Sequence, residues 1–434
     1  MLDISRRSAL VGAAALLTGA GRAAAADVDV AVVGAGAAGI AAAKHLLGRH
    51  RRVVVLEARD RLGGRVHTDR RLGTPFDAGA QYLHWAERNP WTGIAASLGL
   101  KTQEESGGRP FDIYANGVVI PDEERSARRQ AFGRIDRLIA AGASPDRSIA
   151  DAVRAGGEDV TGSAAGLTRL TLGEEPDRCS AADYDQLWAG DDLVCPSGFG
   201  TLVTRHGAGL PVRLSTRVAG IDWSGRGVAL DTASGTVRAR AAIVTVPLGV
   251  VQADAIRFAP GLPAETRDAV DGLRMGAYTK IALRFDRARL AGDLADGIDT
   301  SQAGETMSFE AWPFENDLVI AYLGGDFARR LCQAGERTAV DHATERLAAM
   351  FGSRVRGAIT GGVLADWWDD PHARGAYSIA RPGRLPARLA LRRPVGDRIW
   401  LAGEASAGGG AMTAGGAALE GVRAAGEIDQ RLAA

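Results

Sequence analysis

The chain has 434 residues, of which 46% are hydrophobic, and this is enough to form the cores of two or three compact units. Its 52 basic and 52 acidic residues cancel, and neither sign forms a long block. The balance excludes the electrostatic footprint of a protein that binds nucleic acid or an anionic membrane surface. A small molecule is the expected partner.

The first residues have the pattern of an export signal. An arginine pair at 6–7 precedes an apolar run over 9–20 that is too short to span a bilayer, and residues 23–26 are small. This pattern predicts a twin-arginine signal peptide over residues 1–26, and hence a periplasmic or secreted protein with no membrane attachment after cleavage. An uncleaved anchor with a chance arginine pair is the alternative.

Cysteine and histidine spacing favours neither a disulfide framework nor a metal site. The three cysteines, Cys179, Cys195 and Cys332, show no CxxC spacing. A Cys179–Cys195 bridge is compatible with an oxidising compartment, and two unrelated buried thiols are the alternative. The seven histidines show no HExxH or paired-ligand spacing, so no metal is expected.

After the signal, the chain begins with a strand, glycine turn and helix. An apolar run over 28–33 leads into a GxGxxG motif that opens an alanine-rich helix. Gly34 permits the tight turn, Gly36 lets a pyrophosphate approach backbone N–H groups, and Gly39 lets helix and strand pack closely. The motif therefore predicts a dinucleotide site.

A second predicted strand, over 53–56, ends at Glu57. A carboxylate there can accept hydrogen bonds from ribose hydroxyls and would repel a 2'-phosphate, which favours FAD or NAD over NADP. The next motif, RxGGR at 61–65, can place a guanidinium and further N–H groups on a pyrophosphate. With this loop the chain resembles the flavin-containing amine oxidases, the family that includes the monoamine and polyamine oxidases.

The resemblance runs unevenly from about Val28 to the C-terminus. It implies FAD, and an α/β fold in which a Rossmann-type FAD-binding domain, of the p-hydroxybenzoate hydroxylase and glutathione reductase type, is interleaved with an α+β substrate domain. The FAD-binding domain is expected over residues 27–91, 196–255 and 392–434, and the substrate-binding domain over 92–195 and 256–391.

Two parts of the middle of the chain have a clear periodicity. Residues 92–195 are helical in pattern, and 122–142 has the charged and apolar faces of a helix that would cover the active-site domain. Residues 199–251 predict strands in a meander, with a turn near Ser234 and Gly235.

Lys280 interrupts a predicted strand. Apolar residues alternate along 275–285, and Lys280 lies against that pattern in a chain with only three lysines. A buried ammonium is costly unless it is paired. In the family, a lysine at this position hydrogen-bonds a water that touches flavin N5. The alternative is a lysine that snorkels to the surface from an edge strand.

The resemblance also implies the substrate side of the site. Trp367 is expected beside the isoalloxazine ring, and Tyr377 as one wall of the two-aromatic cage that guides an amine to the flavin. Ala376 stands where monoamine oxidases carry the cysteine that bonds FAD, so non-covalent FAD is expected. His84 matches a histidine that faces substrate in some polyamine oxidases, with a structural histidine as the alternative. Lys280, Tyr377, Trp367 and His84 are the expected catalytic residues.

The second cage wall departs from the family pattern. Counting back from the end of the last helix places Ala418 where the family often has the second aromatic. Either a wider substrate or a wall from Trp85, Trp312 or Trp368 is expected instead.

Further residues are expected at the cofactor. Val218 matches a position whose backbone meets adenine, and Glu404 the acid that binds the ribityl chain. The helix beginning near Gly415 would direct its positive end at the flavin N1–C2 region. The expected cofactor-binding set is Gly34, Gly36, Ala38, Gly39, Glu57, Ala58, Arg59, Gly64, Arg65, Gly79, Ala80, Gln81, Tyr82, Val218, Pro247, Trp367, Gly403, Glu404 and Ala418.

The expected reaction is oxidation of a primary amine or polyamine to an imine and aldehyde, with oxygen reduced to hydrogen peroxide. An L-amino acid oxidase, which would need an arginine for the substrate carboxylate, is one alternative. A dehydrogenase that passes electrons to a periplasmic protein is another, and a flavin-loaded scaffold without turnover is a third. The sequence is compatible with a homodimer.

Overall fold

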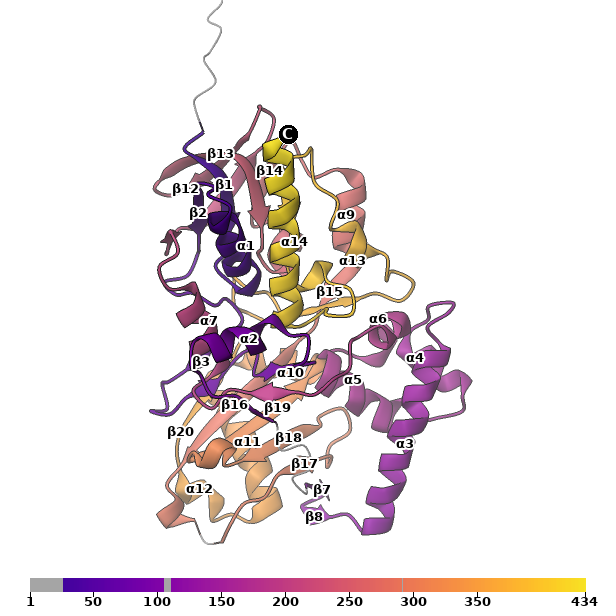
Figure 1. The fold of residues 1–434 in the computed structure, drawn as a ribbon. Coiled ribbons are helices and arrows are strands. Elements are labelled where there is room, and N and C mark those ends of the chain that lie inside the picture. The colour runs from indigo at the N-terminus through magenta and orange to yellow at the C-terminus, as the bar shows by residue number, and fades with distance from the viewer. Residues whose placement is uncertain (1–25, 105–110, 291) are drawn as a thin grey trace, which may run out of the picture.

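The computed structural model describes residues 26–104, 111–290 and 292–434. The predicted signal peptide, apart from Ala26, lies outside the described residues. Two sheets, one in the upper and one in the lower half of Figure 1, organise the described part of the chain. Each sheet draws its strands from segments that are far apart in the sequence, so the predicted interleaving of two units is seen in the strand order.

The first sheet has eight strands within the described residues, in the order β10-β2-β1-β13-β12-β11-β14, with β22 also paired to β13. Their bounds are β1 (Val28–Val33), β2 (Val53–Leu56), β10 (Val212–Arg213), β11 (Val218–Asp222), β12 (Val228–Thr232), β13 (Gly235–Val244), β14 (Arg257–Ala259) and β22 (Ile399–Leu401). The predicted first two strands are confirmed, and β11, β12 and β13 form the predicted meander. The start of that prediction was wrong, because Phe199–Gly207 forms the helix α7. β14 extends this sheet beyond the domain limit expected at residue 255.

Parallel pairing sets the position of the cofactor-side loops. β1 pairs in parallel with β2 and β13, and β13 pairs in parallel with β22. The carboxyl ends of these strands therefore lie at one edge of the sheet, which is where ligands bind in open α/β sheets. The residues that follow them there are Gly34, Glu57, Thr245 and Gly403.

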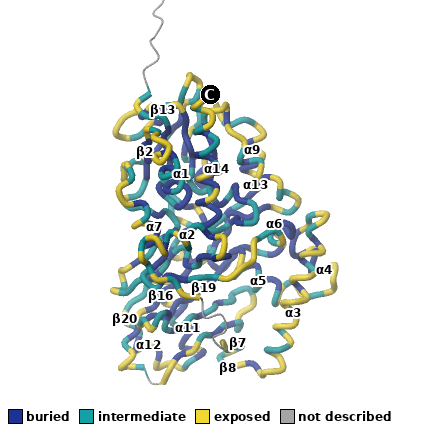
Figure 2. Tube along the Cα trace, in the orientation of Figure 1, coloured by how far each residue is buried: buried dark blue, intermediate teal, exposed yellow. Residues whose placement is uncertain are grey.

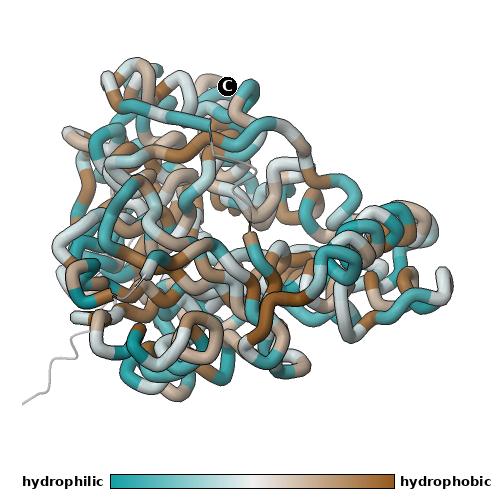
Figure 3. Tube along the Cα trace, turned by 90° about the horizontal axis from the view of Figure 1, so that it is seen from below, coloured by the Kyte–Doolittle hydropathy of each residue, from teal (hydrophilic) through white to brown (hydrophobic). Residues whose placement is uncertain are grey.

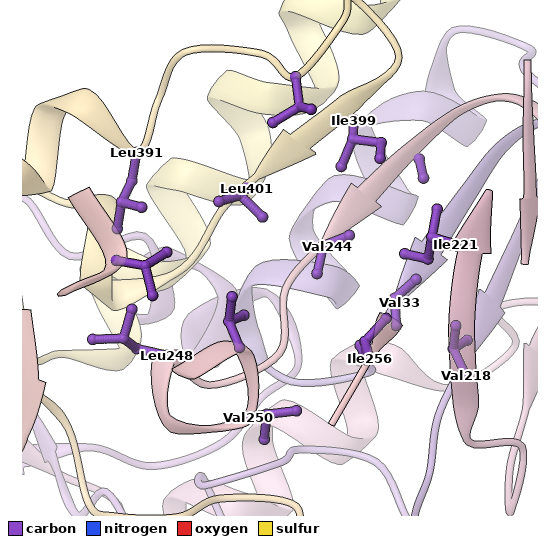
Figure 4. Close-up of a cluster of buried hydrophobic side chains, with 14 of the residues drawn as sticks. Val33, Val218, Ile221, Val244, Leu248, Val250, Ile256, Leu391, Ile399 and Leu401 are labelled. Atoms are coloured by element: carbon purple, nitrogen blue, oxygen red, sulfur yellow. The ribbon is translucent and has the colours of Figure 1, made fainter. Parts of the chain in front are cut away.

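Helices cover both faces of the first sheet, which explains why its parallel strands are almost continuous runs of valine, alanine and isoleucine. α1 (Ala37–Gly48) and α14 (Ala414–Ala433) cover one face and lie side by side in Figure 1. They pack so closely that a Cβ added at Gly421 would lie 2.1 Å from the carbonyl oxygen of Ala38. The other face packs on α8 (Leu248–Gln252), α9 (Ala264–Asp271) and α13 (Ala387–Ala390), and Figure 4 shows this core.

The second sheet has seven strands within the described residues, in the order β20-β16-β19-β18-β17-β7-β8. Their bounds are β7 (Asp112–Ala115), β8 (Val118–Val119), β16 (Tyr278–Phe285), β17 (Gly297–Asp299), β18 (Met307–Ala311), β19 (Leu318–Gly324) and β20 (Ile359–Leu364). α10 (Gly325–Ala334) and α11 (Glu336–Phe351) pack on it. β16 lies between β19 and β20, so the strand that carries Lys280 is internal.

Residues 92–195 form mainly helices, as predicted, and these project to one side in Figures 1 and 3. They include α3 (Asp122–Ala141), α4 (Ile149–Ala155), α5 (Ala165–Leu172) and α6 (Ala181–Asp185). Figure 2 shows that most of α3 is exposed. The prediction of an all-helical pattern was wrong for β7 and β8, which form a hairpin on the edge of the second sheet.

Three further findings concern expected features. All three cysteines are buried and free, so Cys179 and Cys195 form no bridge. The described residues hold no cluster of three or more metal-binding side chains. In the same part of the chain, none of the helices combines the length and apolar character needed to cross a bilayer.

Candidate active site

A cavity of about 890 Å³ runs from the carboxyl edge of the first sheet to the face of β16. Its volume is in the upper part of the range for small-molecule sites, about 300–1,000 Å³. Glycines and small residues of the first unit line one end, and aromatic residues and Lys280 of the second unit line the other. The cavity can therefore hold an elongated ligand against both units.

The glycine turn after β1 has the geometry that the motif predicts. Gly34 has a φ of +104°, which favours glycine, and a Cβ added at Gly39 would lie 1.9 Å from the carbonyl oxygen of Gly34. Gly36 precedes α1 and bridges to Gly63 of the RxGGR loop, while Ala38 on the first turn of α1 faces the cavity. The turn and the RxGGR loop together form one rim of the cavity.

Two helices direct their N-termini at the cavity. Ala37 at the start of α1 and Ala414 at the start of α14 line it, and neither helix has an acidic residue in its first turn. A helix N-terminus carries partial positive charge and attracts anionic groups. Two such termini fit a ligand with a pyrophosphate and an electron-accepting ring.

Glu57 is buried at the end of β2 and lines the cavity. Its carboxylate accepts hydrogen bonds from the backbone N–H groups of Ala35 at 2.6 Å and Arg59 at 2.8 Å. A carboxylate has about four lone-pair sites, so further sites remain for ligand hydroxyls. The Arg59 guanidinium is held by Asp370 at 2.8 Å, which fixes it beside the cavity.

The segment 77–82 is fixed by Lys280 and Trp367. The ammonium of Lys280 donates to the carbonyl oxygen of Asp77 at 2.8 Å and to Oε1 of Gln81 at 2.7 Å. Trp367 Nε1 donates to the carbonyl oxygen of Ala78 at 2.8 Å. Gly79, Ala80, Gln81 and Tyr82 all line the cavity, which brings this predicted cofactor segment and the predicted lysine together.

Lys280 is only 4% exposed, which contradicts the alternative of a lysine that snorkels to the surface. Burial lowers the pKa of its ammonium to about 8, against the opposing effect of Asp77 and Glu310. An ammonium has three hydrogens, and the two acceptors above account for two of them. The third can serve a ligand in the cavity that Lys280 lines.

Tyrosine rings line the same cavity as the lysine. The Tyr377 hydroxyl donates to the carbonyl oxygen of Thr171 at 2.9 Å, and its ring lies 6.1 Å from that of Tyr278. Tyr322 lies directly opposite Lys280 in the β16–β19 register, with the ammonium 5.4 Å from its ring centroid. Tyr278 and Tyr322 line the cavity too, although no sequence motif pointed to them. Tyr278 shares the face of Lys280 because it lies two residues before it on β16.

His84, Trp85 and Trp188 form another wall. His84 Nδ1 lies 2.9 Å from Asp192 Oδ2, so this predicted site residue has a carboxylate partner and still lines the cavity. Trp85 and Trp188 meet edge to face with centroids 5.0 Å apart. A Cβ added at Gly409 would lie 2.1 Å from the Trp188 ring, and one added at Gly415 would lie 2.5 Å from the Trp85 ring. These two glycines therefore provide the room that the rings occupy.

Glu404 is buried and lines the cavity, as does Gly403. Its carboxylate accepts from Arg65 at 3.0 Å and from the Ser378 hydroxyl at 2.6 Å. Gly403 has a φ of +159°, and nothing lies within 4 Å of an added Cβ, so that side of its backbone is open. These residues leave the ligand free access to the backbone at the end of β22.

The structure brings nearly all of the predicted site residues to the cavity. Those that line it are Gly34, Gly36, Ala38, Glu57, Ala58, Arg59, Gly64, Arg65, Gly79, Ala80, Gln81, Tyr82, His84, Val218, Pro247, Lys280, Trp367, Tyr377, Gly403 and Glu404. Gly39 lies behind them in the helix–strand contact, which is the packing role expected of it.

Three expected positions are corrected. Ala418 packs in the core that α14 forms with α1, α2 (Pro90–Ser97) and α7 (Phe199–Gly207), and it does not line the cavity, whereas its neighbour Ala417 does. Ala411, Met412 and Thr413 face the cavity from that segment. Trp312 and Trp368 pack in the second core, so of the expected walls only Trp85 faces the cavity. Trp188 was missed; its only signal is a tryptophan in the turn-like stretch WAGDD.

The fold and the site define a protein that holds a dinucleotide at a sheet edge and presents it to an aromatic pocket. The family description "Flavin containing amine oxidoreductase" matches residues 37–176 and 169–429. The chain belongs to this family, and it is an FAD-dependent amine oxidoreductase with the Rossmann-type FAD-binding fold. The glycine turn, Glu57 and the two helix N-termini fit FAD.

Known proteins of similar sequence and structure include several amine oxidases. The chain is 29% identical to polyamine oxidase 4 of Oryza sativa subsp. japonica over 93% of its own length and 89% of the relative's. It is 26% identical to lysine-specific histone demethylase 1B of Mus musculus, over 92% of its length and 52% of that protein. The fold matches cyclohexylamine oxidase from Brevibacterium oxydans IH-35A with a TM-score of 0.78 and 22% identity, covering 94% of this chain and 100% of that one. An engineered putrescine oxidase matches with a TM-score of 0.74 and 22% identity, covering 93% and 99%.

Proposed function

We propose that the enzyme oxidises a primary amine or a polyamine at the carbon beside the nitrogen, and that oxygen accepts the electrons to give hydrogen peroxide. The resulting imine hydrolyses to an aldehyde and a smaller amine or ammonia. One observation carries the proposal: a buried lysine and three tyrosines, Tyr278, Tyr322 and Tyr377, line a cavity whose other end has the geometry of a dinucleotide site.

When bound, FAD supplies the ring that accepts a hydride equivalent from the amine. Glu57 would hold the ribose hydroxyls, the first turn of α1 the pyrophosphate, and Glu404 the ribityl chain. The N-terminus of α14 would lower the energy of negative charge on the ring. The chain's own contribution is therefore positioning and electrostatics.

The tyrosine rings would orient the amine and keep water from it. Burial raises the pKa of Tyr377 well above its ordinary value, and the same holds for Tyr322, so both hydroxyls stay protonated and act as neutral groups. Only an uncharged amine has the lone pair that the oxidation requires, and an apolar wall favours that form. Lys280 would use its third N–H to hold a water at the reacting face.

The arginines of the cavity weigh against an amino acid as substrate. Within the described residues the cavity is lined by Arg59, Arg65, Arg217 and Arg374. Arg59 is paired with Asp370 and Arg65 with Glu404, and Arg217 lies beside Val218 on the nucleotide side. Of the four, Arg374 is the one left to supply the guanidinium–carboxylate pair that an L-amino acid oxidase needs.

We propose that FAD is bound without a covalent link. Ala376 lines the cavity, and none of the three cysteines does. Acid denaturation followed by ultrafiltration should release the yellow flavin into the filtrate, and flavin retained with the protein would contradict this.

The test of function is anaerobic reduction of the purified holoenzyme with a panel of monoamines, polyamines and amino acids. Bleaching of the flavin by amines, followed by peroxide release on admission of air, supports the proposal. Bleaching by amino acids alone would favour the amino acid oxidase. Bleaching followed by slow reoxidation in air would favour the dehydrogenase, and a flavin that no compound bleaches would favour the scaffold.

We also infer from the arginine pair and apolar run at the start of the sequence that the enzyme is exported after folding. Residues 1–30 fused to a reporter should direct it across the inner membrane. Replacing both arginines at 6–7 by lysine should keep the reporter in the cytoplasm, and export of that variant would contradict the inference.

A further inference from the structure

Asp183 and Arg388 form a fully buried ion pair beside the cavity. Asp183 lies on α6, Arg388 lies on α13, and each side chain is 1% exposed. The pair is bidentate, with contacts of 2.5 Å from Arg388 Nε to Asp183 Oδ1 and 2.6 Å from its second nitrogen to Oδ2. A buried ion pair is usually no more stabilising than a well-packed apolar pair. A contribution to stability therefore does not by itself explain why this pair is present.

Both partners hold the short strand β21 (Ser378–Ala380). Asp183 accepts from the backbone N–H of Ala380 at 2.7 Å. Arg388 donates to the carbonyl oxygen of Ser378 at 2.9 Å and to its hydroxyl oxygen at 2.8 Å. Tyr377 immediately precedes this strand, so the pair fixes the backbone on which that cavity residue depends.

The Ser378 hydroxyl continues the connection to Glu404. It accepts from Arg388 and donates its one hydrogen to Glu404 at 2.6 Å, while the Ser378 backbone N–H donates to the same carboxylate at 3.1 Å. The donor and the acceptor of each hydrogen bond in this series are therefore defined. The series connects α6, in the predicted substrate-binding segment, to the acid at the cofactor end.

We propose that Asp183 and Arg388 are positioning residues of the cofactor site, and that they act on FAD through Ser378 and Glu404. The inference rests on the proposed role of Glu404 toward the ribityl chain. Arg388 holds the Ser378 hydroxyl in the one orientation that lets it donate to Glu404, and this leaves the carboxylate oriented toward the cavity.

The test measures FAD binding to the apoprotein by flavin fluorescence, together with the redox potential of the bound flavin, without any amine. Ser378→Ala removes one oxygen atom and should raise the FAD Kd by about 10-fold, as expected for a lost hydrogen bond to a charged group. Asp183→Asn should raise the Kd at least as much and should shift the potential.

Asp299→Asn is the matched control, because Asp299 on β17 and Arg346 on α11 form another buried pair, 1% and 6% exposed, in the second unit. Asp183→Asn and Asp299→Asn should both lower Tm, but only the first should change the FAD Kd and potential. An equal change in both variants, or an FAD Kd in Ser378→Ala within twofold of wild type, would overturn the inference. If Asp183→Asn fails to fold, Ser378→Ala decides alone.

Glu404→Gln tests the proposed role of Glu404 in FAD binding separately from the positioning role of Asp183 and Arg388. A raised FAD Kd in Glu404→Gln with an unchanged Kd in Ser378→Ala would overturn the inference and leave Glu404 at the cofactor. An unchanged Kd in Glu404→Gln would overturn both. Failure of every amine to reduce the flavin would affect the proposed reaction only.

Discussion

Lys280 and Gln81 are joined by a hydrogen bond of 2.7 Å inside the protein, although 199 residues separate them in the chain. The bond connects β16, an internal strand of the second sheet, to the segment that lines the cofactor end of the cavity. The same ammonium also bonds the carbonyl oxygen of Asp77, so this one side chain makes two of the contacts that join the two units at the site.

Replacing Lys280 by methionine should leave the flavin bound and slow its reaction. The variant loses the third N–H and the positive charge at the cavity, and loss of one such stabilising group typically costs on the order of 100-fold in rate. Stopped-flow measurement of reduction by amine and of reoxidation by oxygen checks this. Lys101→Met, at an exposed position, is the control and should match wild type in both steps.

The lowered pKa of Lys280 makes stability depend on pH with a definite sign. Burial brings the pKa from its ordinary 10.5 to about 8, so between these values the unfolded chain binds more protons than the folded one. The unfolding free energy of wild-type apoprotein should therefore rise, relative to Lys280→Met, as pH increases from about 8 to 10.5. Urea unfolding of both proteins across this range measures the difference, and a constant difference would contradict the assignment.

Gly39→Ala should destabilise the protein and prevent FAD uptake. Its Cβ would lie 1.9 Å from the Gly34 carbonyl oxygen, so α1 must move away from β1, and overpacking of this kind costs about 1–3 kcal/mol or more. Gly48→Ala, at the other end of α1, has nothing within 4 Å of the added Cβ and should keep wild-type stability. Thermal unfolding and flavin content distinguish the two variants. Normal FAD content in Gly39→Ala would contradict the role of the glycine turn in FAD binding.

Trp188→Ala should widen the substrate range. The ring forms part of the cavity wall with Trp85, and removing an aromatic contact should raise KM for small amines on the order of 5-fold while bulkier amines become better substrates. Trp312→Ala, which removes a ring outside the cavity, should leave the ranking of substrates unchanged. The comparison of kcat/KM across an amine series decides between the two positions.

The cofactor end could be predicted from the sequence because backbone geometry dictates its residues. Gly34 and Gly39 are required by a positive φ and a close contact, and Glu57 follows its strand directly. The aromatic end is different, since Trp188 reaches the cavity only through the packing of the helical segment. Ala418 was misplaced by one position: its neighbour Ala417 lines the cavity, and because successive residues of a helix point in different directions, Ala418 packs in the core.

The sequence does contain a signal for the hairpin β7–β8, but the helical periodicity of the surrounding residues obscured it. Its turn is Asn116-Gly117, and both residues have positive φ, which is the geometry of the commonest tight hairpin turn. By contrast, the burial of Lys280 depends on the strands that flank β16, and no local sequence pattern predicts which strands are internal to the sheet.

The interleaving of the chain has a consequence for biosynthesis. Glu404 and the N-terminus of α14 are synthesised after the glycine turn, with all of the second sheet between them in the chain. Because domains fold as they emerge, the nucleotide half must wait for its final strand and helix. Flavin is then expected to load only after α14 has been synthesised, and a nascent polypeptide arrested before α14 should carry no yellow colour.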